Sequence, residues 1–347
     1  MNSKERVLAA IHHSKPDRVP ADLWAASPAT NRLRAHLGVA DDEALWQALG
    51  VDLRSVWPAY TGPELERFDD GTWMDWWGCR RGMIGPFEEV MSAPLAGAAT
   101  PADVEAHLWP APDWFDVAGM RERCQEWSAY ALVTRDPGHH ATCVLRVAMY
   151  LRTMEKFMMD LALNPDLAQA IIAHIQAFYL ELNRRILEAV GDLTHIYFIA
   201  DDVGVQNGLM VSPRMFRKFI RPSLARFIEQ AHAYDQKVMY HTCGAVRQLI
   251  PDFIEMGVDI LNPIQVSAEG MDPAELKAQY GDALCFHGAM DTQTVLANGT
   301  PDQVRAKVEL LVQTLGAGGG YILAPTNNLM PDTPVENVMA MYGGVNG

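Results

Sequence analysis

The sequence lacks the features that mark several large classes of protein. No segment of its 347 residues concentrates Lys and Arg, and the formal net charge is −15. Binding to nucleic acid or to an anionic membrane surface is therefore not expected, because both depend on concentrated positive charge. The longest apolar runs are shorter than the roughly 20 residues of a membrane span. The N-terminal segment MNSKERVLAAIHHSKPDRVP has no apolar core of a secretory signal, so we expect a cytoplasmic protein.

Cysteine and glycine are also sparse where two other classes need them. The five cysteines are far apart and odd in number, which indicates reduced thiols and no disulfide framework. A dinucleotide-binding doubly wound sheet needs a glycine-rich turn after its first strand, but the segment RVPADLWAASPATN contains no glycine. The glycines at 316–320 precede a strand, which is the wrong order for that motif. A doubly wound sheet is therefore the weaker alternative.

Short β-branched or aromatic runs instead alternate with helical patterns along the chain, which is typical of βα units around a parallel sheet. Amphipathic spacing and capping residues predict helices over 3–13, 165–190, 245–256 and 301–316, and one beginning near Ser212-Pro213. We predict a single-domain (β/α)8 TIM-type barrel over residues 1–347, with an inserted Trp-rich subregion at 58–115. The eight candidate strands are 18–24, 53–57, 130–136, 195–202, 237–244, 258–265, 283–291 and 320–328.

Polar residues recur at the ends of these candidate strands. In a barrel the carboxyl ends of all strands share one face, so these side chains should converge although they are far apart in sequence. A single Asp at a strand end is often only a helix cap, and the recurrence is what indicates a site. The recurring residues are Asp201, Asp202, His241, Cys243, Asn262, His287, Asp291, Asn327 and Asn328.

The sharpest local signal is HTCG at 241–244. It places an imidazole and a thiol on one loop, as His241 and Cys243, where both could bind one zinc ion. Two ligands do not complete a zinc site, and the sequence leaves the others open among Asp202, Glu155, His139 and His287. The alternative is a buried structural Cys beside a hydrogen-bonded His.

Other candidates are acid/base groups or substrate contacts. Adjacent carboxylates on a strand cannot both face inward, so one of Asp201 and Asp202 should enter the site while the other caps a helix or pairs with Arg. Gln206 and His139 are expected to contact substrate. Trp77, in the cluster WMDWWG, either lines the site or covers the barrel.

Several segments together resemble the uroporphyrinogen decarboxylase-like superfamily, which includes corrinoid-dependent methyltransferases. The segments that carry the resemblance are KERVLAAIHHSKPDRVP, DGTWMDWWG, ADDVGVQNGLMVSP, YHTCGAVRQLIPDFIEMGVDILNPIQ, CFHGAMDTQTVL and GGGYILAPTNN…PVENV. The resemblance covers nearly the whole chain and implies the same barrel fold.

Within this superfamily the resemblance favours the methyltransferase branch. Decarboxylases carry an Arg-rich loop after the first strand, whereas this sequence has no Arg there before Arg32. The methyltransferases hold zinc with a His-x-Cys, matched by His241 and Cys243, and with a distal Cys whose position falls near Asn327. The implied function is methyl transfer between a small O- or S-methyl or thiol substrate and a corrinoid (cobalamin), with a separate corrinoid protein as partner.

The resemblance also implies roles for the site residues. His241 and Cys243 would bind zinc, Asp202 would serve as acid/base or as a ligand, and Asn262 and His287 would act on or anchor the substrate together with Asn327. A metal-free lyase or decarboxylase for a smaller acid, using Asp202 and His241 for proton transfer, is the alternative. A barrel kept as a binding protein is a third reading and predicts a filled barrel mouth. The oligomeric state stays open, with a homodimer as one option.

Overall fold

A parallel sheet of seven strands forms the centre of the computed structural model, which describes residues 1–85, 87–135 and 142–346. All of its strand pairings are parallel, and its strand order is β1-β7-β8-β11-β12-β13-β14. Seven of the eight predicted strands are therefore confirmed. Their bounds are β1 (Leu53–Val56), β7 (Ala131–Thr134), β8 (Ile196–Ala200), β11 (Lys237–His241), β12 (Ile260–Ile264), β13 (Cys285–Met290) and β14 (Tyr321–Pro325).

The predicted first strand, 18–24, forms only isolated bridges. Ala21 pairs with Leu323 of β14, and the backbone N–H of Asp52 donates to the carbonyl of Ala21 just before β1. A longer ladder is prevented because Pro20 has no N–H, and the N–H of Ala21 donates to the side chain of Asp52 instead of a strand carbonyl. Residues 20–22 nevertheless occupy the eighth position, between β14 and β1, and so close the barrel.

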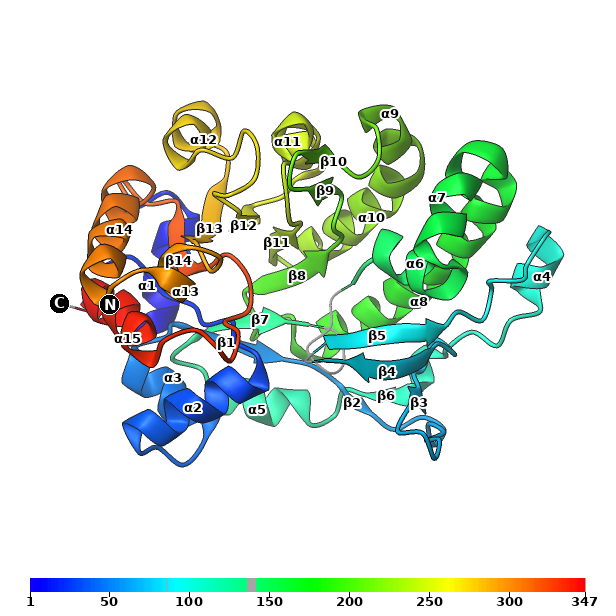
Figure 1. The fold of residues 1–347 in the computed structure, drawn as a ribbon, viewed down its shortest axis with the longest axis horizontal. Helices are drawn as coiled ribbons and strands as arrows, with labels where there is room; N and C mark the ends of the chain where they lie inside the picture. The colour runs from blue at the N-terminus through cyan, green and yellow to red at the C-terminus, as the bar shows by residue number, and fades with distance from the viewer. Residues whose placement is uncertain (86, 136–141, 347) are drawn as a thin grey trace.

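Helices surround this sheet (Figure 1). The longest, α8, buries twelve of its residues at helical spacing, and α14 begins with a capping box between Thr300 and Gln303. The helices before the middle of the chain are α1 (Ser3–Ile11), α2 (Ser27–Leu37), α3 (Asp42–Leu49), α4 (Pro101–Glu105), α5 (Met120–Glu126), α6 (Leu145–Arg152), α7 (Met154–Leu163) and α8 (Pro165–Val190). Those after it are α9 (Pro213–Met215), α10 (Arg221–His232), α11 (Ile250–Met256), α12 (Pro273–Tyr280), α13 (Val295–Asn298), α14 (Pro301–Thr314) and α15 (Val335–Asn346).

The inside of the barrel has its own small core. Every second residue of a strand faces inward, and these side chains pack together with Val7 and Ile11 of α1. The inward strand residues are Leu53, Ala131, Val133, Ile196, Phe198, Ala200, Met239, Ile260, Cys285 and Ile322. The intervening residues, such as Tyr197 and Ile199, belong to the larger core between the sheet and the helices.

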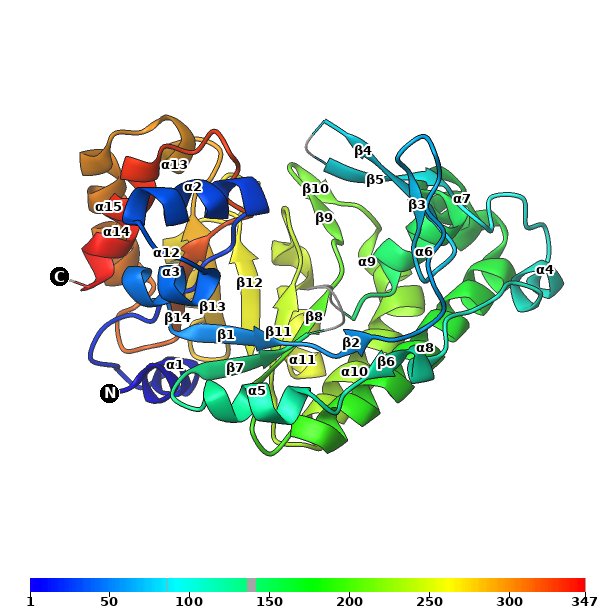
Figure 2. The same ribbon diagram turned by 90° about the horizontal axis from the view of Figure 1, so that it is seen from below.

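The inserted subregion, 58–115, carries two small antiparallel sheets, β2 (Ala59–Tyr60) with β6 (Phe115–Asp116), and β3 (Trp73–Met74) with β4 (Arg80–Ile84) and β5 (Phe87–Ser92). The β3–β4–β5 sheet lies beside α6 and α7 in both views (Figures 1 and 2). Trp77 and Leu95 of this subregion join the core that covers the barrel. No helix of the described chain is long and apolar enough to cross a membrane.

Candidate active site

Alternation along the strands decides which polar side chains enter the barrel. Met239 and Ile260 face inward, so His241 and Asn262, two residues further on, face inward at the carboxyl ends of β11 and β12. The same parity places His287 inward on β13, after Cys285, and Asp202 inward after Ala200 of β8. The strand pattern therefore gathers these polar groups at one end of the barrel.

Three of these side chains form a compact cluster of metal-binding type. His241 Nε2 lies 3.6 Å from Cys243 Sγ and 3.7 Å from Asp202 Oδ1. One ligand atom from each of the three residues lies within 4.8 Å of the others, and the rest of the described chain holds no other such cluster of three. The backbone N–H of Cys243 also donates to Asp202 Oδ1 at 2.8 Å, which holds the loop against β8.

A chain of hydrogen bonds behind His241 fixes its orientation. His241 Nδ1 donates to Asn262 Oδ1, and Asn262 Nδ2 donates to His287 Nδ1. His287 Nε2 donates in turn to Asp22 Oδ2 at 3.0 Å. Because Nδ1 of His241 carries the proton, its Nε2 presents a lone pair to Cys243 and Asp202.

Asp22 anchors this chain. Its Oδ2 also accepts a hydrogen bond from Trp24 Nε1 at 2.8 Å, and the indole of Trp24 stacks on His241 with 5.3 Å between ring centroids. Burial raises the pKa of Asp22, but the hydrogen bonds from His287 and Trp24 outweigh burial and leave the pKa below its usual value. The ionised carboxylate therefore serves as the fixed acceptor at the end of the chain.

Without a bound cation, the cluster does not favour a reactive thiol. Burial raises the pKa of Cys243 to about 12, and the neighbouring carboxylate of Asp202 adds to the increase. Burial also lowers the pKa of His241, against the opposing effect of Asp202. At neutral pH the cluster thus presents a neutral imidazole and a protonated thiol, and a cation bound to it would favour the thiolate.

The cluster opens into a cavity of about 760 Å³ at the carboxyl ends of the strands. We call this cavity the barrel mouth. It is lined by Asp202, His241 and Cys243, by Asn327 and Asn328 after β14, and by polar and aromatic residues from other strand ends. These include Asp22, Trp24, Ser55, Trp57, Arg135, Arg146 and Phe198.

The adjacent carboxylates Asp201 and Asp202 point in opposite directions, as strand alternation requires. Asp201 is buried outside the barrel and accepts hydrogen bonds from the backbone N–H groups of residues 144, 145 and 146, at the start of α6. Burial raises its pKa to about 6 although those bonds oppose the shift. Asp201 is therefore a helix-capping residue, and it does not line the barrel mouth.

Other residues singled out from the sequence lie at different places. Gln206 donates to the carbonyl of Ser267 outside the mouth, and Asn262 and His287 are buried behind His241 without lining the cavity. Asn327 lines the mouth and is exposed. His139 lies outside the described residues.

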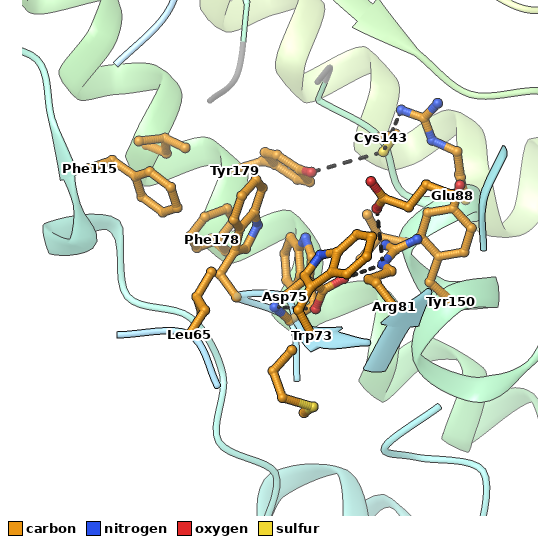
Figure 3. A pocket seen from close by; sticks show the side chains of 16 residues that line it. Leu65, Trp73, Asp75, Arg81, Glu88, Phe115, Cys143, Tyr150, Phe178 and Tyr179 are labelled. Atoms are coloured by element: carbon orange, nitrogen blue, oxygen red, sulfur yellow. Dashed lines mark hydrogen bonds and ion pairs between the residues drawn. The ribbon is translucent and has the colours of Figure 1, made fainter. Parts of the chain in front are cut away.

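Trp77 lines a second, smaller cavity of about 140 Å³ between the inserted subregion and the helices α6 and α8 (Figure 3). We call it the aromatic cavity. Its wall includes Trp73, Trp76, Phe115, Phe178 and Tyr179, and three of its charged side chains pair with one another: Arg81 Nε lies 2.7 Å from Asp75 and 3.8 Å from Glu88. Arg146 lines both cavities, so the two adjoin.

The mouth residues that sequence reasoning missed include Asp22, Trp24, Arg135 and Arg146. The signal was strand parity, since Arg135 follows inward-facing Val133 by two residues. Arg135 lies with its guanidinium carbon 4.0 Å from the ring centroid of Phe198 and 4.9 Å from that of Trp24. Burial lowers its pKa to about 10, which leaves it cationic at neutral pH.

Fold and site thus define an α/β barrel with a Cys–His–Asp cluster at the carboxyl ends of its strands. The model of the uroporphyrinogen decarboxylase (URO-D) family matches residues 140–346, more than half of the chain, and the chain belongs to this family. A solved structure described as a methyltransferase from Methanosarcina mazei has the same fold, with a TM-score of 0.67, 20% identity and coverage of 100% of this chain and 98% of the other.

Curated relatives of this chain carry methyltransferase names. Methylcobamide:CoM methyltransferase MtaA of Methanosarcina barkeri is 29% identical over 143 residues, which are 41% of this chain and 39% of that protein. Methylated-thiol--coenzyme M methyltransferase of Methanosarcina mazei is 24% identical over 57% of this chain and 50% of that protein. The aligned part of the chain thus spans half or less of each of these relatives.

Proposed function

We propose that this protein is a corrinoid-dependent methyltransferase that moves a methyl group between a small thiol or O- or S-methyl substrate and a corrinoid. The observation that carries the proposal is the cluster of Asp202, His241 and Cys243, with the tautomer of His241 set by Asn262. The methylcobamide and methylated-thiol names of the relatives support the same reaction class. A separate protein would supply the corrinoid.

The donor set of the cluster fits zinc. With metal–ligand bonds of about 2.0–2.3 Å, neighbouring ligands of a tetrahedral zinc lie roughly 3.3–3.7 Å apart. The Nε2–Sγ and Nε2–Oδ1 separations of 3.6 and 3.7 Å are close to that range before any metal is present. Three protein ligands leave one position for substrate, which is typical of catalytic zinc.

Asp202 is the proposed third zinc ligand, in place of the distal Cys that is missing near Asn327. The distal Cys that the resemblance predicted is absent from the loop after β14, and a carboxylate on β8 lies against the His–Cys pair instead. Oxygen, nitrogen and sulfur donors all occur in zinc sites. We therefore propose that zinc is held by Asp202, His241 and Cys243.

Each residue then has a distinct task. Zinc, when bound, would favour the thiolate form of a coordinated substrate thiol at neutral pH. His241 is held in place by Asn262 on one side and by the face of Trp24 on the other, so its Nε2 keeps one direction. The mouth, at about 760 Å³, offers more room than a small thiol needs, which suits a second and bulkier reactant. A barrel that served only as a binding protein was expected to have a filled mouth, and this open volume argues against that alternative.

Metal analysis combined with methyl transfer tests the proposal. Purified protein should contain about one zinc per chain and should transfer a methyl group between methylcobalamin and a thiol. Cys243→Ala should lose both properties. Cys124→Ala, in a buried position on α5 outside the mouth, should keep both. Turnover of a small carboxylic acid without metal, retained in Cys243→Ala, would instead support the lyase.

A further inference from the structure

The aromatic cavity is larger than the gaps that ordinary packing leaves. Protein interiors are close-packed, and few of their voids exceed the size of one water molecule. The aromatic cavity has a volume of about 140 Å³. In another protein an apolar cavity of about 150 Å³ binds benzene. The aromatic cavity is therefore large enough for one six-membered ring.

The cavity has a buried floor and a more open rim. Phe115, Phe178 and Tyr179 line it and are each at most 6% exposed. Trp73 and Trp76 also line it but are only half-buried. A small molecule can thus reach the floor from solvent on the side of the two half-buried tryptophans.

The rings of the wall hold one another in fixed orientations. The ring centroids of Trp77 and Phe178 lie 4.9 Å apart at an interplanar angle of 70°, and those of Phe115 and Phe178 lie 5.8 Å apart at the same angle. Trp76 meets Phe115 edge-to-face as well, at 5.8 Å and 85°. Aromatic rings attract one another in this geometry. The wall therefore offers ring faces and edges to a further ring without having to rearrange.

The charged groups of the wall favour an uncharged ligand. Arg81 already pairs with Asp75 and Glu88. Arg81 and Glu88 lie toward the opposite end of the cavity from Phe115 (Figure 3). An anionic ligand would compete with the two carboxylates for Arg81, and a cationic ligand would be repelled by Arg81 and Arg146. An uncharged ring at the aromatic end avoids both costs.

One polar group of the wall has no partner among the described residues. Trp77 is 4% exposed, and its indole Nε1 donates to no described group, although its backbone N–H donates to Asp75. The neighbouring indole of Trp109, by contrast, donates to the carbonyl of Val104 at 3.0 Å. An enclosed donor without an acceptor destabilises the protein. A ligand that brings an acceptor removes this cost when it binds.

We propose that the aromatic cavity binds a small uncharged molecule that has one six-membered aromatic ring and one hydrogen-bond acceptor, such as a phenol. The ring packs against Trp77, Phe115 and Phe178, and the acceptor takes the indole N–H of Trp77. This ligand site is separate from the metal-binding cluster of the barrel mouth. It goes beyond the proposed methyl transfer and does not depend on it.

Fluorine NMR titration tests the site by binding alone. 4-Fluorophenol should bind saturably to the full chain, with one molecule per chain. It should bind about 2- to 10-fold more tightly than fluorobenzene, which is the range for one hydrogen bond between uncharged groups. Trp77→Phe keeps a ring but removes the donor, so this ratio should fall to about one. Cys243→Ala, which alters the barrel mouth, should bind 4-fluorophenol as the wild type does.

Filling the cavity should abolish binding. Val147, on α6, is 3% exposed and lines the cavity, so the larger ring of Val147→Phe should occupy the space of the ligand. Leu310→Phe, at a position on α14 that is 52% exposed, is the control and should keep binding. Melting temperatures show whether both variants fold. If Val147→Phe does not fold, the ratio measured in Trp77→Phe decides.

Four results would overturn the proposal. The first is the absence of saturable binding by the wild type, and the second is full binding by a folded Val147→Phe. Loss of binding in Cys243→Ala would instead place the phenol in the barrel mouth. Displacement of 4-fluorophenol by tetramethylammonium would make the cavity a cage for organic cations, which aromatic rings also bind.

Discussion

The two adjoining cavities differ in how their charged groups are arranged. In the aromatic cavity, Arg81 pairs with Asp75 and Glu88 and packs over the ring of Tyr150, so these three charged side chains are paired within the wall (Figure 3). In the barrel mouth, Arg135 forms no ion pair with a described residue, although Asp22 acts on its pKa, and His241 and Cys243 line the cavity.

This difference separates polar groups that stabilise the fold from polar groups that are available to bind a ligand. A cavity whose polar groups are already paired gains little by binding a polar ligand, because the ligand would have to replace existing contacts. In a cavity whose donors and acceptors are unpaired, the buried polar groups destabilise the empty protein. A ligand that pairs with these groups removes that free-energy cost when it binds. The wall of the barrel mouth is assembled from eight separate segments of chain. Of the two cavities, the barrel mouth is the one expected to gain more from binding a polar ligand.

Removing one carboxylate from each cavity should give the largest contrast. Asp202→Ala deletes a proposed zinc ligand, and we expect zinc affinity to fall by at least about 100-fold, since even indirect partners of metal ligands contribute 10- to 100-fold. Methyl transfer should fall with it. Glu88→Ala, in the aromatic cavity, should leave both unchanged. Zinc titration with a chromophoric competitor measures the effect, and full zinc binding by Asp202→Ala would contradict the three-residue site.

Removing one arginine from each cavity should destabilise the protein more at the aromatic cavity than at the barrel mouth. In Arg81→Met, Asp75 loses a partner within a pair whose side chains are 9% and 12% exposed, and the free energy of unfolding should fall by about 3 kcal/mol. Arg135→Met breaks no ion pair with a described residue, so its free energy of unfolding should stay within about 1 kcal/mol of the wild type or rise. Urea unfolding of the two zinc-free variants measures both values. Equal losses would show that Arg135 has a structural partner after all.

Breaking the hydrogen-bond chain behind His241 should have an intermediate effect. Asn262→Leu removes the acceptor for His241 Nδ1, which frees the ring to rotate and change tautomer, and zinc affinity should fall by about 10- to 100-fold. Asn183→Leu replaces another buried asparagine, on α8 away from the mouth, and should leave zinc affinity unchanged. An unaltered affinity in Asn262→Leu would mean that Trp24 alone orients the ring.

Period-two patterns made most of the barrel predictable from the sequence. Runs such as HIYFIADD and KVMYHTCG give seven strands at the predicted places, and parity along them already separates Asp201 from Asp202. The sequence could not show that segment 18–24 forms no full strand. This outcome depends on a tertiary contact, in which the side chain of Asp52 accepts the N–H of Ala21.

The centre of the site was predictable, but its supporting residues were not. His241 and Cys243 share one loop and give a local signal. The chain from His241 to Asp22 joins β11, β12, β13 and the segment before α2, so no local pattern contains it. Arg135 was overlooked for a related reason: its neighbours in the mouth, Trp24 and Phe198, lie far from it in sequence.

Protonation of His107 in the inserted subregion should lower the free energy of unfolding at acid pH. This is the smallest of the expected effects. Burial lowers the pKa of His107, and its Nε2 donates to the carbonyl of Trp77 at 3.1 Å. The folded protein therefore binds a proton less readily at this site than the unfolded chain does. The stabilising contribution of the neutral ring is present above about pH 6.5 and is lost as the pH falls below it. His174, which bonds Glu105 and stacks on Trp109, lies close by and opposes protonation further.

Replacing the ring by a neutral donor isolates this effect from the barrel mouth. His107→Gln can still donate to the carbonyl of Trp77 but does not titrate, so its stability should fall less than that of the wild type between pH 7 and 5. Urea unfolding of zinc-free protein, followed by tryptophan fluorescence at several pH values, measures the difference. Identical pH profiles for the two proteins would show that the pKa of His107 is the same in the folded and unfolded states.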